Sequence, residues 1–218
     1  MKDRLAVIVS KNPTNVLIET VKGIQLYYPE FDIVIIDSDS TDKTWYTKVP
    51  SDCTIEFVQN KGWELGAWTY AFNKYNTYKV YMFIQDSLIP KCRIPNFDKT
   101  TFENGLLYSF HYIARICDGG YFEELQSVYK YTNLDFIANL KPDFIITGTA
   151  HTSFITNAEN VNSILCLEDA YVQKQISKSR IHCWLSERTG GLVPTILKNK
   201  RVDITPYFTK THGNRDLI

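Results

Sequence analysis

Short apolar runs separated by longer mixed segments organise the first ninety residues of the chain. Leu5–Val9 and Ile33–Ile36 are continuously apolar, which is the pattern of a strand covered on both faces. Two further runs of strand length follow, rich in β-branched and aromatic residues. The pattern therefore predicts strands at Leu5–Val9, Ile33–Ile36, Thr54–Val58 and Lys79–Ile84.

The segments between these strands carry the spacing and the end signals of helices. Asn12–Asn15 opens a helix that continues through Tyr28 and is stopped by Pro29. A short helix follows the capping sequence Ser40-Thr41-Asp42, and another is predicted at Trp63–Tyr75. This alternation of strands and helices predicts an α/β fold with a mostly parallel central sheet and right-handed crossovers.

A polar cluster follows each predicted strand. The clusters are Ser10-Lys11-Asn12, Asp37-Ser38-Asp39, Asn60-Lys61-Gly62 and Gln85-Asp86-Ser87. In open α/β sheets, ligands bind beyond the carboxyl ends of the strands, where these clusters would lie together. We therefore expect one binding site built from loops that are distant in the sequence.

The pattern is less regular from residue 91 onward. We predict helices at Glu103–Cys117, Phe122–Leu140, Asp169–Ser177 and Leu192–Asn199, and strands at Phe144–Ile146 and Arg201–Ile204. Repeats, low-complexity tracts and flexible linkers are absent from the sequence. The chain is therefore expected to form a single domain, 1–218, with a Rossmann-like half, 1–90, and an irregular half, 91–218.

Composition narrows the function. The chain has 24 Lys and Arg residues against 24 Asp and Glu residues, so it lacks the basic footprint expected of a nucleic-acid-binding protein. Its 5 scattered cysteines form no CxxC pair, which favours a reduced, cytoplasmic protein. Leu5–Val9 is too short for a signal peptide core or a membrane span, so we expect a soluble chain without either.

The turn after the second strand holds the first candidate ligands. Asp37 and Asp39 can accept hydrogen bonds from a nucleobase N–H or a ribose hydroxyl. Alternatively, Asp37 begins a turn, and Asp39 or Ser40 caps the next helix. Asp86 leaves a buried strand where a metal ion would bridge it to a diphosphate, and a turn carboxylate before Pro90 is the alternative.

Lys61 and Gly62 precede a predicted helix, whose N-terminal N–H groups can meet a phosphate. Gly62 permits close backbone approach, and Lys61 adds positive charge. The chain contains neither G-x-G-x-x-G nor G-x-x-x-x-G-K-[ST], so neither a dinucleotide-dependent oxidoreductase nor a P-loop NTPase is supported.

In order and spacing, these motifs resemble a family-2-type glycosyltransferase of the GT-A fold. More particularly, the chain resembles the small glycosyltransferases of large DNA viruses, of the chlorella-virus type, that build capsid glycans. The resemblance covers the N-terminal half and only short motifs beyond it. It implies that residues 1–90 bind a nucleotide-sugar and that residues 91–218 bind the acceptor, in the host cytoplasm if the protein is viral.

The resemblance also implies roles for individual residues. Uridine would be held by Asp37, with further nucleotide contacts from Asp39, Ser10, Asn12, Lys61 and Gly62. The family's metal motif is Asp-x-Asp, but this chain has Gln85-Asp86-Ser87 and keeps only the middle carboxylate. Mn²⁺ or Mg²⁺ would then be bound by Asp86 and His212, and the donor sugar and diphosphate would be contacted by Gln85, Asp86, Ser87, Lys210 and Arg215.

A disordered basic tail is the alternative for residues 210–215.

Glu168-Asp169 matches the Glu-Asp pair that precedes a late helix in the enzymes that the chain resembles, where the aspartate of inverting members is the general base. A carboxylate at a helix N-terminus is held ionised and oriented, so Asp169 suits that role. Simple capping of the helix Asp169–Ser177 is the alternative.

The expected function is transfer of a sugar from a nucleotide-diphosphate donor, a UDP-sugar in particular, to a hydroxyl of a glycan or glycoprotein. One alternative is a non-catalytic nucleotide- or glycan-binding module, which the incomplete metal motif favours. Another is a sugar-phosphate nucleotidyltransferase, but Ser10-Lys11-Asn12-Pro13 lacks the Gly-rich basic loop of that class.

Overall fold

The computed structural model describes residues 3–59, 63–97, 106–115, 139, 141–173 and 200–211. The first half contains β1 (Arg4–Ser10), α1 (Asn15–Tyr27), β2 (Phe31–Ser38), η1 (Thr44–Lys48), β3 (Thr54–Val58), α2 (Trp63–Lys74), β4 (Val80–Gln85) and β5 (Leu88–Pro90). The described parts of the second half contain β6 (Leu107–Arg115), β7 (Ile145–Asn157), α5 (Ala158–Gln173), β8 (Arg201–Asp203), η4 (Thr205–Tyr207) and β9 (Phe208–Lys210).

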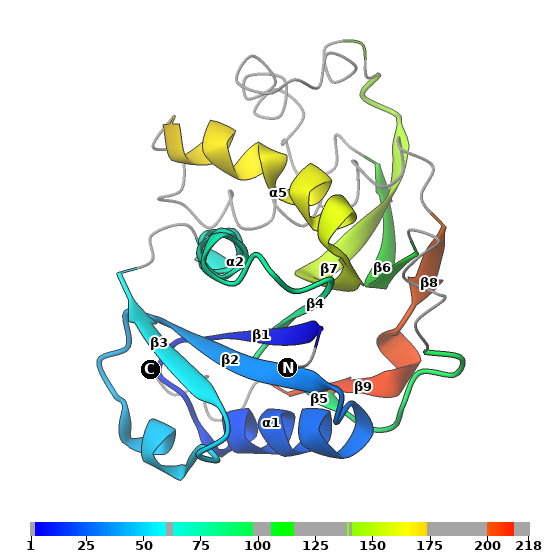
Figure 1. The fold of residues 1–218 in the computed structure, drawn as a ribbon. Helices are drawn as coiled ribbons and strands as arrows, with labels where there is room; N and C mark the ends of the chain where they lie inside the picture. Colours follow the sequence, from blue (N-terminus) through cyan, green and yellow to red (C-terminus); the bar gives the residue numbers. More distant parts are fainter. Residues whose placement is uncertain are drawn as a thin grey trace.

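Among the described residues, seven strands form the central sheet in the order β3-β2-β1-β4-β7-β6-β8 (Figure 1). β1 pairs in parallel with β2 and with β4, and β3 extends the parallel part beyond β2. β7 pairs antiparallel with both β4 and β6, and β8 runs parallel to β6. The predicted α/β fold with a mostly parallel sheet is thus confirmed, and the strand order reverses at β1, between β2 and β4.

Helices on both sides of the sheet explain the continuous apolar sequence of β1. Ala6 and Ile8 belong to the core on the α1 side, whereas Leu5, Val7 and Val9 belong to the core shared with α2 and α5 (Figure 1). Successive residues of a strand point to opposite faces of the sheet. A strand covered on both faces therefore needs an apolar side chain at every position.

The segment predicted as a helix at Glu103–Cys117 forms the strand β6 where the structure describes it. Tyr108 and Phe110 pack in the core on the α1 side, and Leu107 packs in the core on the α2 side. This alternation is the two-residue period of a strand rather than the 3.6-residue period of a helix. The helix prediction was therefore wrong over residues 107–115.

The last described helix begins earlier than the predicted Asp169–Ser177. α5 starts at Ala158, directly after β7, and ends at Gln173. Asn157 caps it, because its Oδ1 atom accepts a hydrogen bond from the backbone N–H of Asn160 at 2.9 Å. Asp169 therefore lies in the C-terminal part of a helix, and its predicted position at a helix N-terminus was wrong.

The other predictions for the second half have mixed outcomes. The strand at Phe144–Ile146 exists as β7, which is longer and continues to Asn157, and the strand at Arg201–Ile204 is confirmed as β8. Apart from residue 139, the predicted helices Phe122–Leu140 and Leu192–Asn199 lie outside the described residues.

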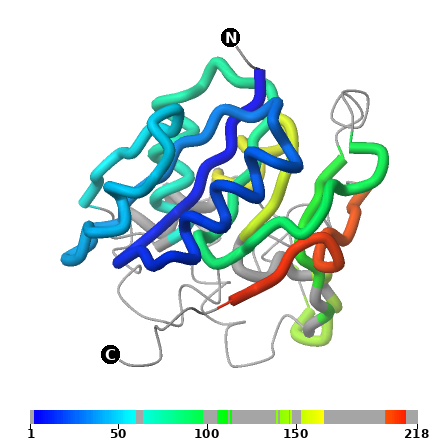
Figure 2. Tube along the Cα trace, turned by 90° about the horizontal axis from the view of Figure 1, so that it is seen from below, coloured from blue at the N-terminus to red at the C-terminus, as the bar shows by residue number. Residues whose placement is uncertain are grey.

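A two-stranded ribbon brings residues 208–211 next to the end of β4. β5 pairs antiparallel with β9, with Leu88 opposite Lys210 and Pro90 opposite Phe208. The backbone N–H of Thr211 donates to the Ser87 carbonyl at 3.0 Å. Figure 2 shows β9, in red, beside the green segment that contains β5. Pairing between segments more than a hundred residues apart thereby completes this corner of the molecule.

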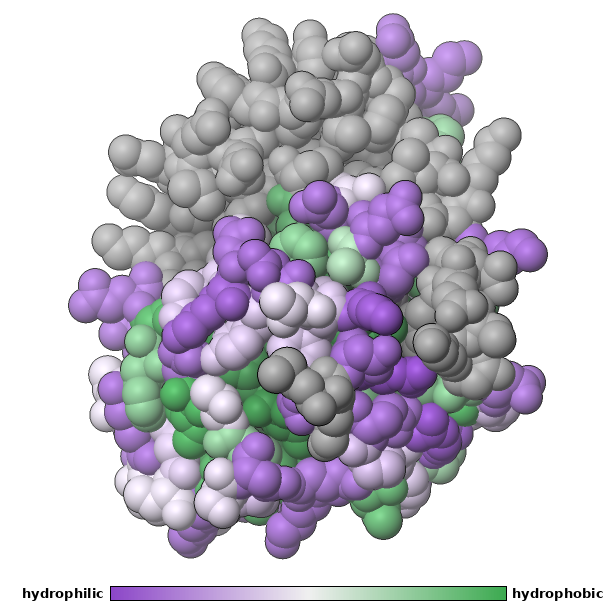
Figure 3. Space-filling view, in the orientation of Figure 1, coloured by the Kyte–Doolittle hydropathy of each residue, from purple (hydrophilic) through white to green (hydrophobic). Residues whose placement is uncertain are grey.

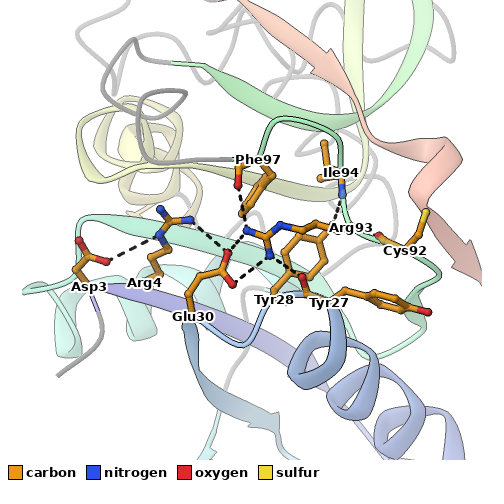
Figure 4. Close-up of polar contacts among 9 residues, drawn as sticks. All are labelled: Asp3, Arg4, Tyr27, Tyr28, Glu30, Cys92, Arg93, Ile94 and Phe97. Atoms are coloured by element: carbon orange, nitrogen blue, oxygen red, sulfur yellow. Dashed lines mark hydrogen bonds and ion pairs between the residues drawn. The ribbon is translucent and has the colours of Figure 1, made fainter.

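A charged cluster fastens the C-terminal end of α1 to the segment after β5 (Figure 4). Glu30 accepts hydrogen bonds from both terminal nitrogens of Arg93, at 2.7 and 3.1 Å, and from Arg4 at 3.4 Å. Arg93 also donates to the carbonyl oxygens of Tyr27 at 2.7 Å and Phe97 at 3.0 Å. Paired bonds from one guanidinium fix its orientation, so the cluster fastens together the start of β1, the end of α1 and the segment after β5.

The described surface is mixed in character. Hydrophilic residues are spread across the described part of the face shown in Figure 3, and hydrophobic residues show between them. Large apolar side chains that are exposed are Leu26, Phe57, Ile113 and Ile145. Within the described ranges, none of the helices has both the length and the apolar character needed to cross a membrane.

Gly23 lies where α1 crosses the β5 segment. A Cβ atom at this position would lie 2.8 Å from Pro90 Cδ and 3.2 Å from the Pro90 carbonyl oxygen. Both neighbours are held rigidly, one by the proline ring and the other by the backbone. Gly23 therefore permits the close approach of α1 to this segment.

We expect Gly23→Ala to lower the free energy of unfolding by about 1–3 kcal/mol, measured by chemical denaturation, because the added methyl group overpacks the contact with Pro90. Helix propensity alone favours alanine by about 1 kcal/mol, so the sign of the change separates the two effects. Lys22→Ala, at an exposed position of the same helix, is the control and should change stability by less than about 0.5 kcal/mol. A more stable Gly23→Ala protein would contradict the packing.

Candidate functional site

Buried polar side chains gather at the carboxyl ends of three neighbouring strands, β1, β2 and β4. They are Ser10, Asp37, Ser38, Ser40, Asp86 and Ser87. The ends lie side by side, because Ser10 is opposite Asp37 in the β1–β2 ladder and Val9 is opposite Gln85 in the β1–β4 ladder. This edge includes the point where the strand order reverses, which is where α/β sheets bind ligands.

The carboxylate of Asp37 is held by the turn that follows β2. Asp37 is 1% exposed, and its Oδ2 atom accepts a hydrogen bond from the Ser40 backbone N–H at 3.1 Å. Its Oδ1 atom accepts from the hydroxyl groups of Ser40 and of Tyr46, the latter at 2.6 Å. Within the described residues, these contacts are those of a turn, and the nucleoside-binding role of Asp37 stays a prediction.

Tyr46, on η1, links this turn to β1. Burial, followed by its hydrogen bond to Asp37, raises the pKa of the Tyr46 hydroxyl well above its usual range, while the nearby hydroxyls of Ser40 and Ser10 oppose that shift. Tyr46 therefore stays a neutral donor to a buried carboxylate. The short helix after Asp42 could be predicted from the capping sequence, but only the fold shows that a tyrosine on it donates a hydrogen bond to Asp37.

Asn12 joins the loop after β1 to the loop after β2. Its backbone N–H donates to Ser40 Oγ at 2.7 Å, and its side-chain Oδ1 accepts from the backbone N–H groups of Thr41 at 2.9 Å and Asp42 at 3.1 Å. Asn12 and Asp39 both adopt positive φ, at 50° and 60°, a conformation that Asn and Asp tolerate better than most residues. The two loops are therefore fixed to each other, with Asp39 exposed on the second.

Asp86 is the second buried carboxylate of this edge, at 3% exposure. Its Oδ2 atom accepts from Ser10 Oγ at 2.6 Å, and its backbone N–H donates to the Val9 carbonyl at 3.1 Å. The Thr20 hydroxyl of α1 donates to the Asp86 carbonyl at 2.8 Å. Asp86 thus ties the end of β4 to β1 and to α1.

Gln85 and Ser87, on either side of Asp86, contact a lysine from the far end of the chain. The Lys210 ammonium donates to Gln85 Oε1 and to Ser87 Oγ, each at 2.5 Å. The Gln85 side-chain amide in turn donates to Glu64 Oε1 at 2.6 Å. The structure therefore brings together three of the residues predicted to face a donor diphosphate, Gln85, Ser87 and Lys210, and adds Glu64, which sequence reasoning missed.

The described donors at this edge do not fit a divalent metal ion. Such ions prefer several carboxylate oxygens that converge on one point. Asp86 is buried against Ser10, whereas Gln85 and Ser87 offer neutral oxygens that an ammonium group already contacts. In the part of the chain that the structure describes, there is no group of three or more His, Cys, Asp or Glu side chains able to hold a metal.

Several predicted site residues lie outside the described ranges: Lys61, Gly62, His212 and Arg215. Their roles stay predictions. The backbone of Asp169 is described and lies within α5, so the helix N-terminus that would have held its carboxylate ionised is instead at Ala158. A role for Asp169 as general base stays a prediction without that support.

A shallow pocket of about 280 Å³ lies elsewhere, near the beginning of β2. It is lined by Gln25, Pro29, Phe31, Asp32, Ile33, Asp52 and Cys53. Because β2 begins at Phe31 and ends at Ser38, this pocket is at the opposite end of the strand from the buried polar cluster. Its polar side chains are already hydrogen-bonded, Gln25 to Asp52 and Asp32 to Tyr78. Because α/β sheets bind ligands at the carboxyl ends of their strands, we place the functional site at that edge.

Comparison with known proteins supports the fold. No family model matches the chain, and no curated protein matches it. Among solved structures, core-mannan synthase A (CmsA/Ktr4) from Aspergillus fumigatus, in its Mn/GDP form, is similar over 93% of this chain and 71% of its own, with 11% identity and a TM-score of 0.50. At this identity the likeness concerns the fold alone, and the chain has a GT-A-like fold.

The hydrogen bond from Tyr46 to Asp37 gives a prediction. Tyr46→Phe removes one donor from a carboxylate that stays buried, so the free energy of unfolding should fall by about 1–3 kcal/mol in chemical denaturation. Tyr27→Phe is the matched control, because the Tyr27 hydroxyl has no hydrogen-bond partner among the described residues. Equal stability of the two variants would show that Tyr46 does not support Asp37.

Proposed function

We propose that this protein is a glycosyltransferase that binds a nucleotide-diphosphate sugar at the carboxyl edge of β1, β2 and β4 and transfers the sugar to a hydroxyl of a glycan. The observation that carries the proposal is the group of buried polar side chains at the strand reversal of a GT-A-like sheet, where Ser10 donates to Asp86 and Tyr46 donates to Asp37. Buried carboxylates are tolerated where hydrogen bonds satisfy them, so the donors around Asp37 and Asp86 hold the loops at this edge in one arrangement.

Rigid loops support this assignment. A nucleotide is held by a few polar groups whose positions are fixed before it arrives, which lowers the entropic cost of binding. Asn12 fixes the loop after β1 to the loop after β2. The hydrogen bond from Tyr46 to Asp37 holds the start of the second loop. In this proposal, Asp39, which is exposed on the same loop, is the carboxylate that contacts the nucleoside.

Charge supports a diphosphate at the other side of the edge. A nucleotide-sugar carries its negative charge on the diphosphate, and Lys210 supplies a positive charge beside the end of β4 and the beginning of β5. The order of groups along the edge is then nucleoside near the β2 loop and diphosphate near β4. The transferred sugar would lie toward the second half of the chain, which binds the acceptor.

The donor nucleotide is a uridine or guanosine diphosphate sugar in this proposal. The resemblance of the motifs favours uridine, whereas the mannan synthase with the similar fold was solved with GDP. Both are nucleoside diphosphates with the same phosphate chemistry, so a panel that includes both separates them.

We expect at least one UDP-sugar or GDP-sugar to raise the melting temperature of the protein, because a ligand that binds only the folded state stabilises it. Slow release of the nucleoside diphosphate from that donor, measured by chromatography, should accompany binding. Binding without release, across donors and glycan acceptors, would favour a non-catalytic binding module. A panel in which no nucleotide or nucleotide-sugar binds would overturn the proposal.

Asn12→Ala should weaken donor binding, because it releases the loop after β2 from the loop after β1 and leaves two backbone N–H groups without their acceptor. We expect the dissociation constant, measured by calorimetry, to rise roughly tenfold. Asn15→Ala is the control, because Asn15 is exposed and its side chain contacts only Glu19 among the described residues. The same affinity in both variants would place the nucleotide away from these loops.

A further inference from the structure

The three residues after the apolar part of β4 stand where a metal-dependent enzyme of this fold would carry Asp-x-Asp. Here the two outer positions are Gln85 and Ser87, which are neutral. The middle carboxylate, Asp86, is 3% exposed and accepts a hydrogen bond from Ser10 on β1. The outer positions of this motif therefore lack the carboxylates that attract a divalent ion, and the remaining carboxylate, of Asp86, is hydrogen-bonded to Ser10 at the end of β1.

An ammonium group lies at the two outer positions instead. Lys210 Nζ is 2.5 Å from Gln85 Oε1 and 2.5 Å from Ser87 Oγ. The pairing of Lys210 with Leu88, and the hydrogen bond from the Thr211 N–H to the Ser87 carbonyl, fix the lysine backbone beside the same turn. The lysine is therefore held by main-chain pairing as well as by its side-chain contacts.

The orientation of the Gln85 amide is determined on both sides. Its nitrogen donates to Glu64 Oε1 at 2.6 Å, which leaves its oxygen facing the ammonium group of Lys210. An aspartate at position 85 would instead place a carboxylate near Glu64, and like charges at that distance repel. Gln85 thus matches its two neighbours, an acidic side chain and a basic one, in a way that a metal-binding carboxylate would not.

We infer that Lys210 takes the place of the divalent cation at the donor diphosphate, so that nucleotide binding and sugar transfer by this protein need no metal. This inference rests on the proposed function. The ammonium group carries a positive charge that offsets part of the charge of a diphosphate, and a phosphate oxygen, as a charged acceptor, can replace one of the neutral acceptors that it now contacts.

The chemistry balances without a metal. The acceptor hydroxyl oxygen forms a bond to the anomeric carbon of the sugar, and the bond from that carbon to the β-phosphate oxygen breaks. The electron pair of the broken bond stays on that oxygen, and the hydroxyl proton leaves to a base or to water. Lys210 stabilises the leaving nucleoside diphosphate by donating hydrogen bonds to the oxygens where negative charge develops.

The test compares UDP and GDP binding by calorimetry, and donor turnover, in protein freed of metal by EDTA and in protein given Mn²⁺ or Mg²⁺. We expect the better nucleotide to bind with the same affinity, within about twofold, in all three conditions. Lys210→Met should weaken its binding at least about tenfold in EDTA, whereas Lys210→Arg should keep most of it. Lys22→Met removes the same charge from an exposed position on α1 and should leave affinity unchanged.

Each failure points to a different conclusion. Binding that is lost in EDTA, restored by Mn²⁺ and unaffected by Lys210→Met would overturn the role of Lys210 and leave the proposed glycosyltransferase intact. Absence of binding to any nucleotide, with or without metal, would overturn both. Melting temperatures of the variants, recorded in parallel, separate lost affinity from lost folding.

A gain-of-function variant tests the same inference from the other direction. Gln85→Asp with Ser87→Asp in the Lys210→Met background restores two outer carboxylates and removes the competing ammonium. We expect this triple variant to bind the nucleotide at least about tenfold more tightly with Mn²⁺ than in EDTA, a dependence that the wild-type protein does not show. A wild-type protein with the same Mn²⁺ dependence as the triple variant would contradict the inference.

Discussion

Burial of two carboxylates, at the ends of the two strands that flank β1, is the constraint on which the candidate site depends. A buried carboxylate is tolerated only where hydrogen-bond donors surround it: Asp37 obtains its donors from the loop after β2 and from η1, and Asp86 obtains one from Ser10 at the end of β1. Supplying those donors fixes Ser10, Ser40 and Tyr46 in turn. The edge is therefore rigid because its buried carboxylates need these hydrogen bonds. The exposed residues of the same loops, such as Asp39, are held in place by the same contacts.

The site also depends on segments that are far apart in the sequence. β1, β2 and β4 give the edge, α1 contributes a hydroxyl through Thr20, and β9 contributes Lys210. The parallel strands guarantee that the first three ends meet, because carboxyl ends of adjacent parallel strands share an edge. Lys210 reaches the edge in a different way, because the antiparallel ribbon of β5 and β9 places it there. The sequence before residue 200 contains no pattern that predicts this ribbon.

Much of the fold could be predicted from the sequence because β1, β2 and β4 are buried on both faces and read as continuous apolar runs. The same physics made β6 difficult: Tyr108 and Phe110 alternate with residues facing another core, which resembles an amphipathic helix over a short window. Asp169 was misplaced because the capping signal of Asn157 went unrecognised. The grouping of Lys210 with Gln85 and Ser87 was predicted, but their direct contact required the fold.

The small size of the β5–β9 ribbon has a kinetic consequence. Three residue pairs hold β9, whereas β1 is paired with β2 from Arg4 to Ser10 and with β4 from Arg4 to Val9. Short, peripheral elements open at a much lower free energy than a central sheet, so backbone amides here should exchange with solvent long before those of β1. Every such opening takes a positive charge away from the edge and returns it. The apparent strength of anion capture by this protein is then scaled by the fraction of time the ribbon is closed.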